Sequence, residues 1–595
     1  MRLTLLSLTI LLSILTQNLY ANSSMKEMLE YLASDALEGR KPGQIGNELA
    51  TSYIEKKLVD MGLAPLGKSH KQDFTIFTEM TKSGTNNLSI SGQKISSYEP
   101  ISFSLSGDLK NKELVFVGYG ISISKNDTKI KYDDYENIDV KNKIVIFMSG
   151  DPAIGNINSP FRHPDYISYR SLFYKLKNAI GHGAVGAIYI NDPMSIPGYP
   201  AEDEPYFNAT EGGGNRFSIV VGRTTNAAIK RSIPSLDIYK IQKKIAKTGI
   251  PYSFSLKKTA DLSVNLKKKT GRVSNIVGVI EGSDPVLKKE VVVLGAHMDH
   301  LGHGGESSTD PIPDGKIHNG ADDNASGTVL VMSLANKIKK MNPKRTYVFV
   351  LFNAEEMGLL GSTHFVNMWA AHTEQYGEIV SMLNYDMVGR YDKELSVMGV
   401  GSSKEWSRLF PATPSTHNFV LKKNALESSD HAPFIRAKIP SLFFTTGAHG
   451  DYHSSTDTAE KINYQPMLTL QDYSIKLIKQ MEANSRIVFD NSYSSGTTTG
   501  TRGYGAHLGC IPSFGQSDDI VGVLCTGTSP NSPAQAAGIL ADDIIVQIGE
   551  VEIKSIYDLA FALKYYRAGD KIELGWMRGQ TLFKQVITLA RSRRQ

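Results

Sequence analysis

Two segments, VVVLGAHMDH at 291–300 and HNGADDNASG at 318–327, decide the fold of the central part of the chain. The apolar run that opens the first segment is typical of a buried parallel strand, so His297 and Asp299 would emerge at its carboxyl end. Open α/β sheets place their functional sites at this end of the strands. Imidazole and carboxylate groups are metal ligands, and two aspartates of the second segment precede a predicted helix. We therefore expect a metal-dependent hydrolytic centre here.

The sequence around these segments, from about 275 to 484, alternates between strand, loop and helix patterns. This alternation predicts an α/β fold, with a mostly parallel, mixed sheet flanked by helices. Strands are expected at 291–295, 346–352, 379–385 and 440–446, and helices at 325–341, 357–371 and 466–484.

Five residues with ligand side chains follow these predicted strands: His297, Asp323, Glu356, Asp386 and His453. Two histidines and three carboxylates suit two zinc ions if one carboxylate bridges them, and Asp323 best fills that position. Two ions that share one water would lower the pKa of that water towards neutrality.

The segment FNAEEMGLLGS at 352–362 places two glutamates side by side. We assign Glu356 to the metal and Glu355 to general-base and then general-acid catalysis. The alternative is a pair in the first turn of a helix that complements the helix dipole. Tyr452, next to His453, has a hydroxyl that could donate to a developing oxyanion.

Four further residues near these motifs are expected to play lesser roles. Asp430 and His431 are interpreted as wall residues or as residues that orient the ligands. Because five ligands already fill a two-zinc site, His300 and His303 are expected to be remote from the metals or exposed.

The segments before the central part carry weaker patterns. Apolar residues at helical spacing between 25 and 63 predict two helices that form a packing layer. Between about 67 and 270 short strands predominate, among them 143–150 and 185–192, which predicts a lid or an inserted docking module. Arg162, His163 and His182 in this region are expected to be surface or capping residues.

The two ends of the chain carry separate patterns. Residues 1–21 have the pattern of a secretory signal peptide, with an uncleaved membrane anchor as the alternative. A Ser/Thr/Gly tract at 491–503 is typical of a linker before a small C-terminal domain. Cys510 and Cys525 in that domain could form one disulfide or remain two buried thiols. The net charge of +5 does not indicate a nucleic-acid partner.

Six motifs together identify a family. In order and spacing, GAHMDHLG, NGADDNASG, FNAEEMGLLGS, LNYDMVG, SSDHAPF and DYHSSTDT resemble the co-catalytic zinc aminopeptidases, which include bacterial leucyl aminopeptidases and the glutamate carboxypeptidase II group. The resemblance implies that His297 and Asp386 hold one zinc, that Glu356 and His453 hold the other, and that Asp323 bridges them. It also implies that Glu355 is the base and that Asp299 orients His297 rather than binding metal.

Two further resemblances concern the flanking regions. LASDALEGR, KIVIFMSGD and GAVGAIYIND resemble the N-terminal part of the same family interrupted by a protease-associated domain. HLGCI at 507–511 and the sequence after it resemble a PDZ domain, which implies a groove for the C-terminal carboxylate of a peptide. The expected domains are the signal peptide at 1–21, the N-terminal peptidase part at 22–110, the insert at 111–260, the catalytic domain at 270–487, the linker at 488–503 and the PDZ domain at 504–592.

The expected function is that of an exported two-zinc exopeptidase that removes N-terminal residues from peptides. A carboxypeptidase or dipeptidase of the same fold is the nearest alternative, and Arg390 could serve the cationic pocket that it needs. Glutaminyl cyclase is a relative that uses one zinc, against which the five ligands argue. A non-catalytic scaffold that binds peptides through its PDZ domain is the alternative from another class.

Overall fold

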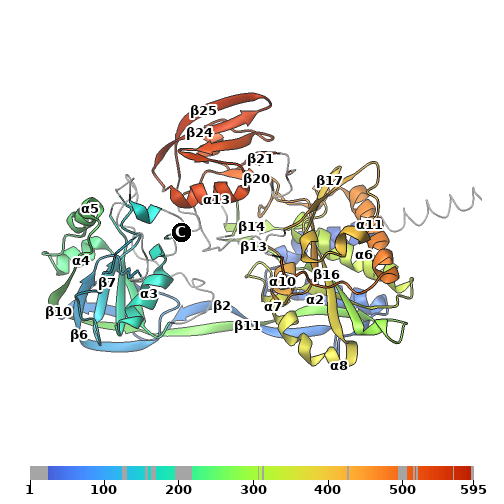
Figure 1. The fold of residues 1–595 in the computed structure, drawn as a ribbon. Coiled ribbons are helices and arrows are strands. Elements are labelled where there is room, and N and C mark those ends of the chain that lie inside the picture. The colour runs from blue at the N-terminus through green and yellow to red at the C-terminus, as the bar shows by residue number, and fades with distance from the viewer. Residues whose placement is uncertain are drawn as a thin grey trace, which may run out of the picture.

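The computed structural model describes residues 24–123, 130–154, 159–162, 166, 169–193, 217–305, 307–310, 314–424, 428–493, 506–513, 516, 520–566 and 568–590. They form three bodies, each built on a main sheet of its own (Figure 1). The predicted signal peptide, His163 and most of the predicted linker lie outside these residues. Within the described part, no helix is both long enough and apolar enough to cross a bilayer.

The large body, at 24–82 and 266–487, contains the predicted parallel sheet. Its strand order is β1-β11-β15-β12-β16-β19-β17-β18, and β2 also pairs with β11. The neighbours β15, β12, β16 and β19 run parallel. The strands are β1 (Ala64–Pro65), β2 (Lys71–Lys82), β11 (Leu266–Ile280), β12 (Glu290–His297), β15 (Thr346–Phe352), β16 (Glu378–Tyr385), β17 (Glu394–Met398), β18 (Asn418–Lys422) and β19 (Ser441–Thr445), with a separate hairpin of β13 (Gly302–Gly304) and β14 (Asp314–His318).

Helices cover the faces of this sheet, which explains why its central strands are apolar throughout. All seven residues of β15 are buried, as expected for a strand with both faces covered. The fold predicted for the central part is confirmed. The helices are one at 24–32, η1 (Asp35–Arg40), α2 (Ile45–Asp60), α6 (Gly327–Lys339), α7 (Leu360–Met368), α8 (Thr373–Tyr376), α9 (Trp406–Leu409), α10 (His431–Arg436) and α11 (Tyr464–Ala483).

The insert, at 87–264, is a second α/β body joined to the first by the long antiparallel strands β2 and β11 (Figure 1). Its strand order is β4-β3-β10-β6-β7-β8-β9-β5, with β6 to β9 parallel. Residues 87–110, which we assigned to the peptidase part, contribute strands to this sheet. The elements are β3 (Asn87–Ile90), β4 (Gln93–Lys94), β5 (Tyr98–Pro100), β6 (Gly107–Val117), β7 (Ile144–Met148), α3 (Leu172–Gly181), β8 (Gly186–Ile190), β9 (Val220–Thr224), α4 (Asn226–Ser232), α5 (Ile238–Thr248) and β10 (Ser253–Val264).

The C-terminal body, at 506–590, has an antiparallel sheet in the order β20-β21-β22-β24-β25. A disulfide between Cys510 and Cys525 joins β20 to β21, which settles the alternative that the sequence left open. The elements are β20 (Cys510–Pro512), β21 (Val523–Thr528), α12 (Pro533–Ala536), β22 (Ile544–Ile548), β23 (Val551–Glu552), α13 (Ile556–Tyr565), β24 (Lys571–Arg578) and β25 (Thr581–Thr588).

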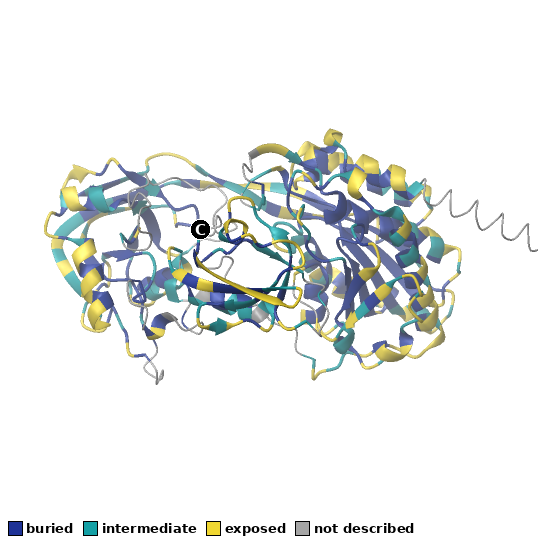
Figure 2. Cartoon of the chain, turned by 90° about the horizontal axis from the view of Figure 1, so that it is seen from above, coloured by how far each residue is buried: buried dark blue, intermediate teal, exposed yellow. Residues whose placement is uncertain are grey.

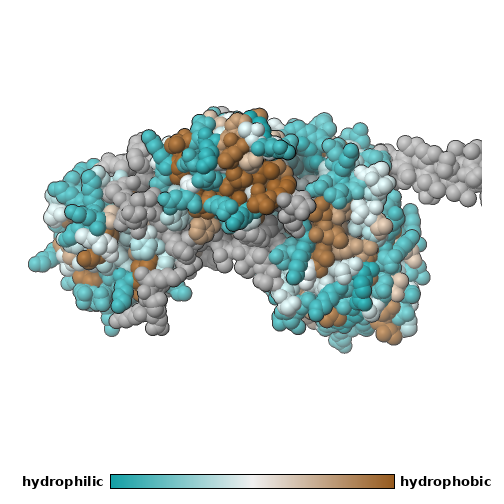
Figure 3. All heavy atoms as spheres, turned by 45° about the horizontal axis from the view of Figure 1, so that its top comes forward, coloured by the Kyte–Doolittle hydropathy of each residue, from teal (hydrophilic) through white to brown (hydrophobic). Residues whose placement is uncertain are grey.

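The three bodies have separate hydrophobic cores. Buried residues gather inside the large body and inside the insert (Figure 2), and a third cluster fills the C-terminal body. The C-terminal body also shows apolar side chains on its surface (Figure 3). Its exposed large apolar residues include Val521, Leu540, Leu582, Phe583 and Val586. The Thr526 hydroxyl donates to the carbonyl of Ala448 at 3.5 Å, so this body touches the large one.

Candidate metal centre

The five predicted ligands lie at the carboxyl ends of the parallel strands. His297 ends β12, and Asp323 lies in the tight turn that precedes α6. Glu356 follows β15, Asp386 follows β16, and His453 lies in the loop after β19. The sequence folds this way because each apolar run ends where a polar loop begins, and neighbouring parallel strands end at the same edge. All five side chains are largely buried.

The side chains form two sets that share Asp323. His297 Nε2 lies 3.3 Å from Asp323 Oδ1 and 3.4 Å from Asp386 Oδ1. On the other side, His453 Nε2 lies 3.3 Å from Asp323 Oδ2 and 3.2 Å from Glu356 Oε2. The two oxygens of Asp323 therefore face different histidines, which is the geometry that a bridging carboxylate requires.

The donor atoms fit a pair of zinc ions. Asp323 Oδ2 and Asp386 Oδ1 are buried and have no hydrogen-bond partner among the described residues, although buried polar atoms normally have one. Burial opposes a charge on His297 and His453, but the carboxylates around each ring outweigh it and raise the pKa of both well above the usual range. The centre therefore favours bound positive charge, and imidazole with carboxylate is a donor set that zinc accepts.

His300 departs from our expectation. The side chain is fully buried, with Nδ1 2.9 Å from Glu356 Oε1 and 3.9 Å from Asp323 Oδ2. The prediction that it is remote or exposed is wrong, because the chain that follows β12 stays buried and brings His300 against Glu356. His300 forms a second potential ligand set with Asp323 and Glu356, the carboxylates that His453 also faces. His303, in contrast, is exposed as expected.

Asp299 contacts the loop that carries the two glutamates. Its Oδ1 lies 3.9 Å from His297 Nδ1, which is long for a hydrogen bond. Its carboxylate accepts the backbone N–H groups of Glu355 at 3.1 Å and of Glu356 at 3.3 Å. Burial raises the pKa of Asp299 to about 6. The closest contacts of this carboxylate therefore fix the glutamate loop rather than the ring of His297.

Glu355 and Tyr452 have the environments that proton transfer and hydrogen-bond donation require. Burial, together with the carboxylates of Glu356 and Asp430, raises the pKa of Glu355 well above its usual range. Burial and the nearby carboxylates also raise the pKa of Tyr452, so its hydroxyl stays protonated. The Tyr452 ring stacks on His453 with ring centroids 3.9 Å apart.

Three non-glycine residues in this region adopt left-handed backbone conformations. They are Ala354, Met387 and His453, with φ of 59°, 56° and 56°. Each lies at or beside a predicted ligand or the predicted base. Such conformations are uncommon outside glycine and cluster at functional sites, where the surrounding structure holds them in place.

The sequence did not reveal several residues that form hydrogen bonds to the predicted metal-binding residues and so fix their positions. Ser429 donates its hydroxyl to Asp386 Oδ2 at 2.7 Å and accepts from Asn384 Nδ2 at 2.8 Å. The carboxylate of Asp457 accepts the backbone N–H of Asp323 at 3.0 Å. Only the position of Ser429 beside Asp430, in a motif already singled out, could have pointed to it. Asp430 and His431 are fully buried, consistent with wall positions.

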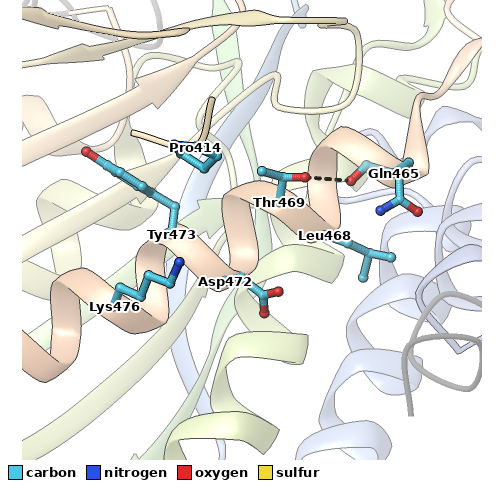
Figure 4. A pocket seen from close by; sticks show the side chains of 7 residues that line it. All are labelled: Pro414, Gln465, Leu468, Thr469, Asp472, Tyr473 and Lys476. Carbon is cyan, nitrogen blue, oxygen red and sulfur yellow. Dashed lines mark hydrogen bonds between the residues drawn. The ribbon is translucent and has the colours of Figure 1, made fainter. Parts of the chain in front are cut away.

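Two further features of this body are a paired arginine and a pocket. Arg390, the candidate for a cationic pocket, pairs through Nη1 with Asp451 Oδ2 at 2.9 Å. A separate pocket lies along α11, and none of its lining residues belongs to the metal centre (Figure 4). The hydrogen bond drawn there, from Thr469 Oγ1 to the carbonyl of Gln465 at 3.2 Å, lies within the helix itself.

Comparison with known proteins gives two family matches and a set of relatives. Residues 275–478 match the model of peptidase family M28, and residues 526–578 match a PDZ domain. Aminopeptidase YwaD of Bacillus subtilis (strain 168) is 26% identical over 263 residues, which are 40% of this chain and 54% of that protein. An aminopeptidase of Pseudomonas aeruginosa (strain UCBPP-PA14) is 24% identical over 364 residues, 55% of this chain and 59% of that protein. The chain thus spans less than two thirds of these relatives.

Among solved structures, the chain is similar to an aminopeptidase from Aneurinibacillus sp. strain AM-1. The sequence identity is 20%, the TM-score is 0.48, and the match covers 80% of this chain and 98% of that one. The sheet and the buried His/Asp/Glu centre described above define an α/β domain with a candidate metal site. The match to peptidase family M28 thus falls on the body that holds this centre, and the match to a PDZ domain falls on the C-terminal body.

Proposed function

We propose that this protein is an exported aminopeptidase that uses two zinc ions to remove N-terminal residues from peptides. The observation that carries the proposal is the pair of donor sets that share Asp323, together with Glu355, whose carboxylate acts electrostatically on His297. The family match over 275–478 and the aminopeptidase relatives support it.

The zinc ions, when bound, would acidify a water and polarise the scissile carbonyl. His297 and Asp386 would hold one ion, Glu356 and His453 the other, and Asp323 both. Glu355 would take a proton from the water and deliver it to the leaving amine, for which its raised pKa suits it.

Three residues would assist this chemistry. The protonated hydroxyl of Tyr452 would donate to the oxyanion that develops on the substrate carbonyl. Asp299 would keep Glu355 and Glu356 in place through their backbone N–H groups. Ser429 would orient Asp386.

The alternatives are less well supported. A carboxypeptidase needs a free cation for the substrate carboxylate, whereas Arg390 is already paired with Asp451. A glutaminyl cyclase needs one zinc, whereas two donor sets are present here. A scaffold without catalysis would have no reason to keep Glu355 and all five ligands together.

Export and peptide capture are further parts of the proposal. The disulfide between Cys510 and Cys525 supports export, because disulfides persist in oxidising compartments. The pattern at 1–21 supports a periplasmic or secreted location. We also propose that the PDZ domain binds the C-terminal end of an extended peptide beside its sheet.

The decisive experiment is hydrolysis of a panel of peptides with free or acetylated N-termini, with and without a chelator, by protein that lacks residues 1–21. We expect cleavage only of peptides with a free amine, and none after chelation. Release of C-terminal residues from acetylated peptides would move the assignment to a carboxypeptidase. Bound zinc without any cleavage would favour the scaffold.

A further inference from the structure

The loop before α2 reaches the metal centre, although its sequence predicted only a packing layer. Gly39 and Arg40 have left-handed backbones, with φ of 67° and 51°. A Cβ atom on Gly39 would lie 2.4 Å from the carbonyl oxygen of His318 and 2.6 Å from that of Gly302. Only glycine permits this approach, so the loop is packed tightly against the segments between β12 and α6.

The Arg40 side chain is fully buried and binds carbonyls in two segments that carry predicted ligands. Its Nε donates to the carbonyl of Met298 at 2.8 Å, between His297 and Asp299 in sequence. Its Nη1 and Nη2 donate to the carbonyls of Asn319 at 2.6 Å and Gly320 at 2.9 Å, just before the turn that carries Asp323. One guanidinium therefore connects the loop of the first ligand to the loop of the bridging ligand.

The backbone of Arg40 extends this connection to the glutamate loop. Its carbonyl accepts from Asn47 Nδ2 at 3.0 Å. The side-chain amides of Asn47 and Asn353 pair with each other at 3.1 and 2.9 Å. Asn353 lies two residues before Glu355, so the contacts around Arg40 reach three of the loops that form the centre.

Arg40 is also a cation placed close to a group of buried acids. Burial lowers the pKa of Arg40 to about 10, against the opposing effect of four carboxylates, and the group therefore remains charged at neutral pH. Those carboxylates belong to Asp299, Asp323, Asp457 and Glu356. A planar guanidinium can donate to several carbonyls in fixed directions, which a lysine ammonium cannot reproduce.

We propose that Arg40 is a positioning residue of the metal centre, which holds the loops of His297 and Asp323 at the separation that two zinc ions need. The inference rests on the proposed two-zinc site and extends it to a residue more than 250 positions away in sequence. Arg40 touches neither substrate nor metal in this role. Its loss lowers zinc affinity because the ligand loops are no longer held in place before the ions bind.

The test compares Arg40→Met with Arg345→Met in the full chain. Arg345 is a matched control because it is equally buried in the same body and also binds backbone carbonyls, those of Met481 at 2.6 Å and Asn484 at 3.0 Å. Arg345 Nε also donates to Glu290 Oε2 at 2.8 Å, at the start of β12, and none of these partners lies in the metal centre. Zinc content and zinc affinity are measured by competition with a chromophoric chelator, and thermal unfolding is followed with and without zinc.

We expect Arg40→Met to weaken zinc binding by roughly 10- to 100-fold, the range seen when residues that orient ligands are removed. Arg345→Met should lower the unfolding temperature and leave zinc affinity unchanged. Unchanged zinc affinity in Arg40→Met, or an equal loss in both variants, would overturn the inference.

If Arg40→Met does not fold, Arg40→Lys decides, since it keeps the charge but not the fork of donors. Weakened zinc binding in folded Arg40→Lys supports the proposal, and full affinity overturns it. Wild-type protein that binds no zinc would refute the proposed function itself, and would be recognised before any variant is compared.

Discussion

Two buried clusters of charged residues lie at the carboxyl ends of parallel strands, one in the large body and one in the insert. In the insert, Lys175 Nζ donates to the carbonyls of Met148 at 2.6 Å and Gly150 at 2.7 Å. Asp134 accepts from two backbone N–H groups and a tyrosine hydroxyl, and Asp192 accepts from Gln242 Nε2 at 2.8 Å. In the metal centre, Asp323 Oδ2 and Asp386 Oδ1 have no such partner within the described part of the chain.

The difference separates a structural cluster from a binding site. A buried charge is tolerated when opposite charges and hydrogen bonds compensate it, as around Lys175. Buried acceptor atoms without partners, gathered around two histidines, are instead free to bind a ligand. Similar residue types at similar places in two sheets therefore serve different purposes, and the hydrogen bonds distinguish them.

The largest expected effect tests the metal centre. Glu355→Gln should reduce kcat by roughly 10²- to 10⁴-fold, because a general base contributes about this much, while two zinc ions stay bound. The measurement is peptide hydrolysis together with zinc content. Glu378→Gln, at an exposed glutamate that begins β16, is the control and should have normal activity. Near-normal rates in Glu355→Gln would show that another group is the base.

The next effect tests the insert. Lys175→Met leaves the buried carbonyls of Met148 and Gly150 without their donor, which should destabilise the insert by about 2 kcal/mol. Hydrogen exchange over β7 and α3 measures this loss, and zinc content should not change. The control is Lys177→Met, at an exposed residue of the same helix. If Lys175→Met lost zinc as well, the two clusters would not be independent.

A smaller effect concerns the hydrogen bond that orients Asp386. Ser429→Ala should weaken zinc binding by roughly 10-fold, near the lower end of the range for such supporting residues. Ser407→Ala, on the exposed side of α9, is the matched change and should leave zinc binding intact. Chelator competition distinguishes the two variants, and equal affinities would remove Ser429 from the site.

The smallest effect is a pH dependence in the insert. Burial raises the pKa of Asp134 from 3.8 to about 7, so between these values the folded state holds a proton that the unfolded state has released. Stability should therefore fall as the pH rises, by about 1 kcal/mol between pH 5 and pH 6. Asp134→Asn should remove this slope, as measured by hydrogen exchange over β6. A slope that persists in the variant would assign the titration to another group.

The sequence predicted the central strands β12, β15, β16 and β19 of the large body and the five ligand positions, because both depend on short-range patterns. An apolar run followed by polar residues marks the end of a buried strand, and parallel strands bring such ends together. We placed the start of the insert at 111, whereas the strand β3, at Asn87–Ile90, already belongs to its sheet. The strands β3 to β5 are short and only partly buried, so their pattern is weak.

The sequence by itself determined which residue types gather at the metal centre, and the tertiary structure decided what holds them there. The contact between Arg40 and Met298 joins residues 258 positions apart, and no local pattern encodes it. The burial of His300 and the hydrogen bond from Ser429 to Asp386 likewise depend on how separate segments pack. Hydrophobic periodicity is a property of neighbouring residues, whereas hydrogen-bond partners are chosen only when the whole chain has folded.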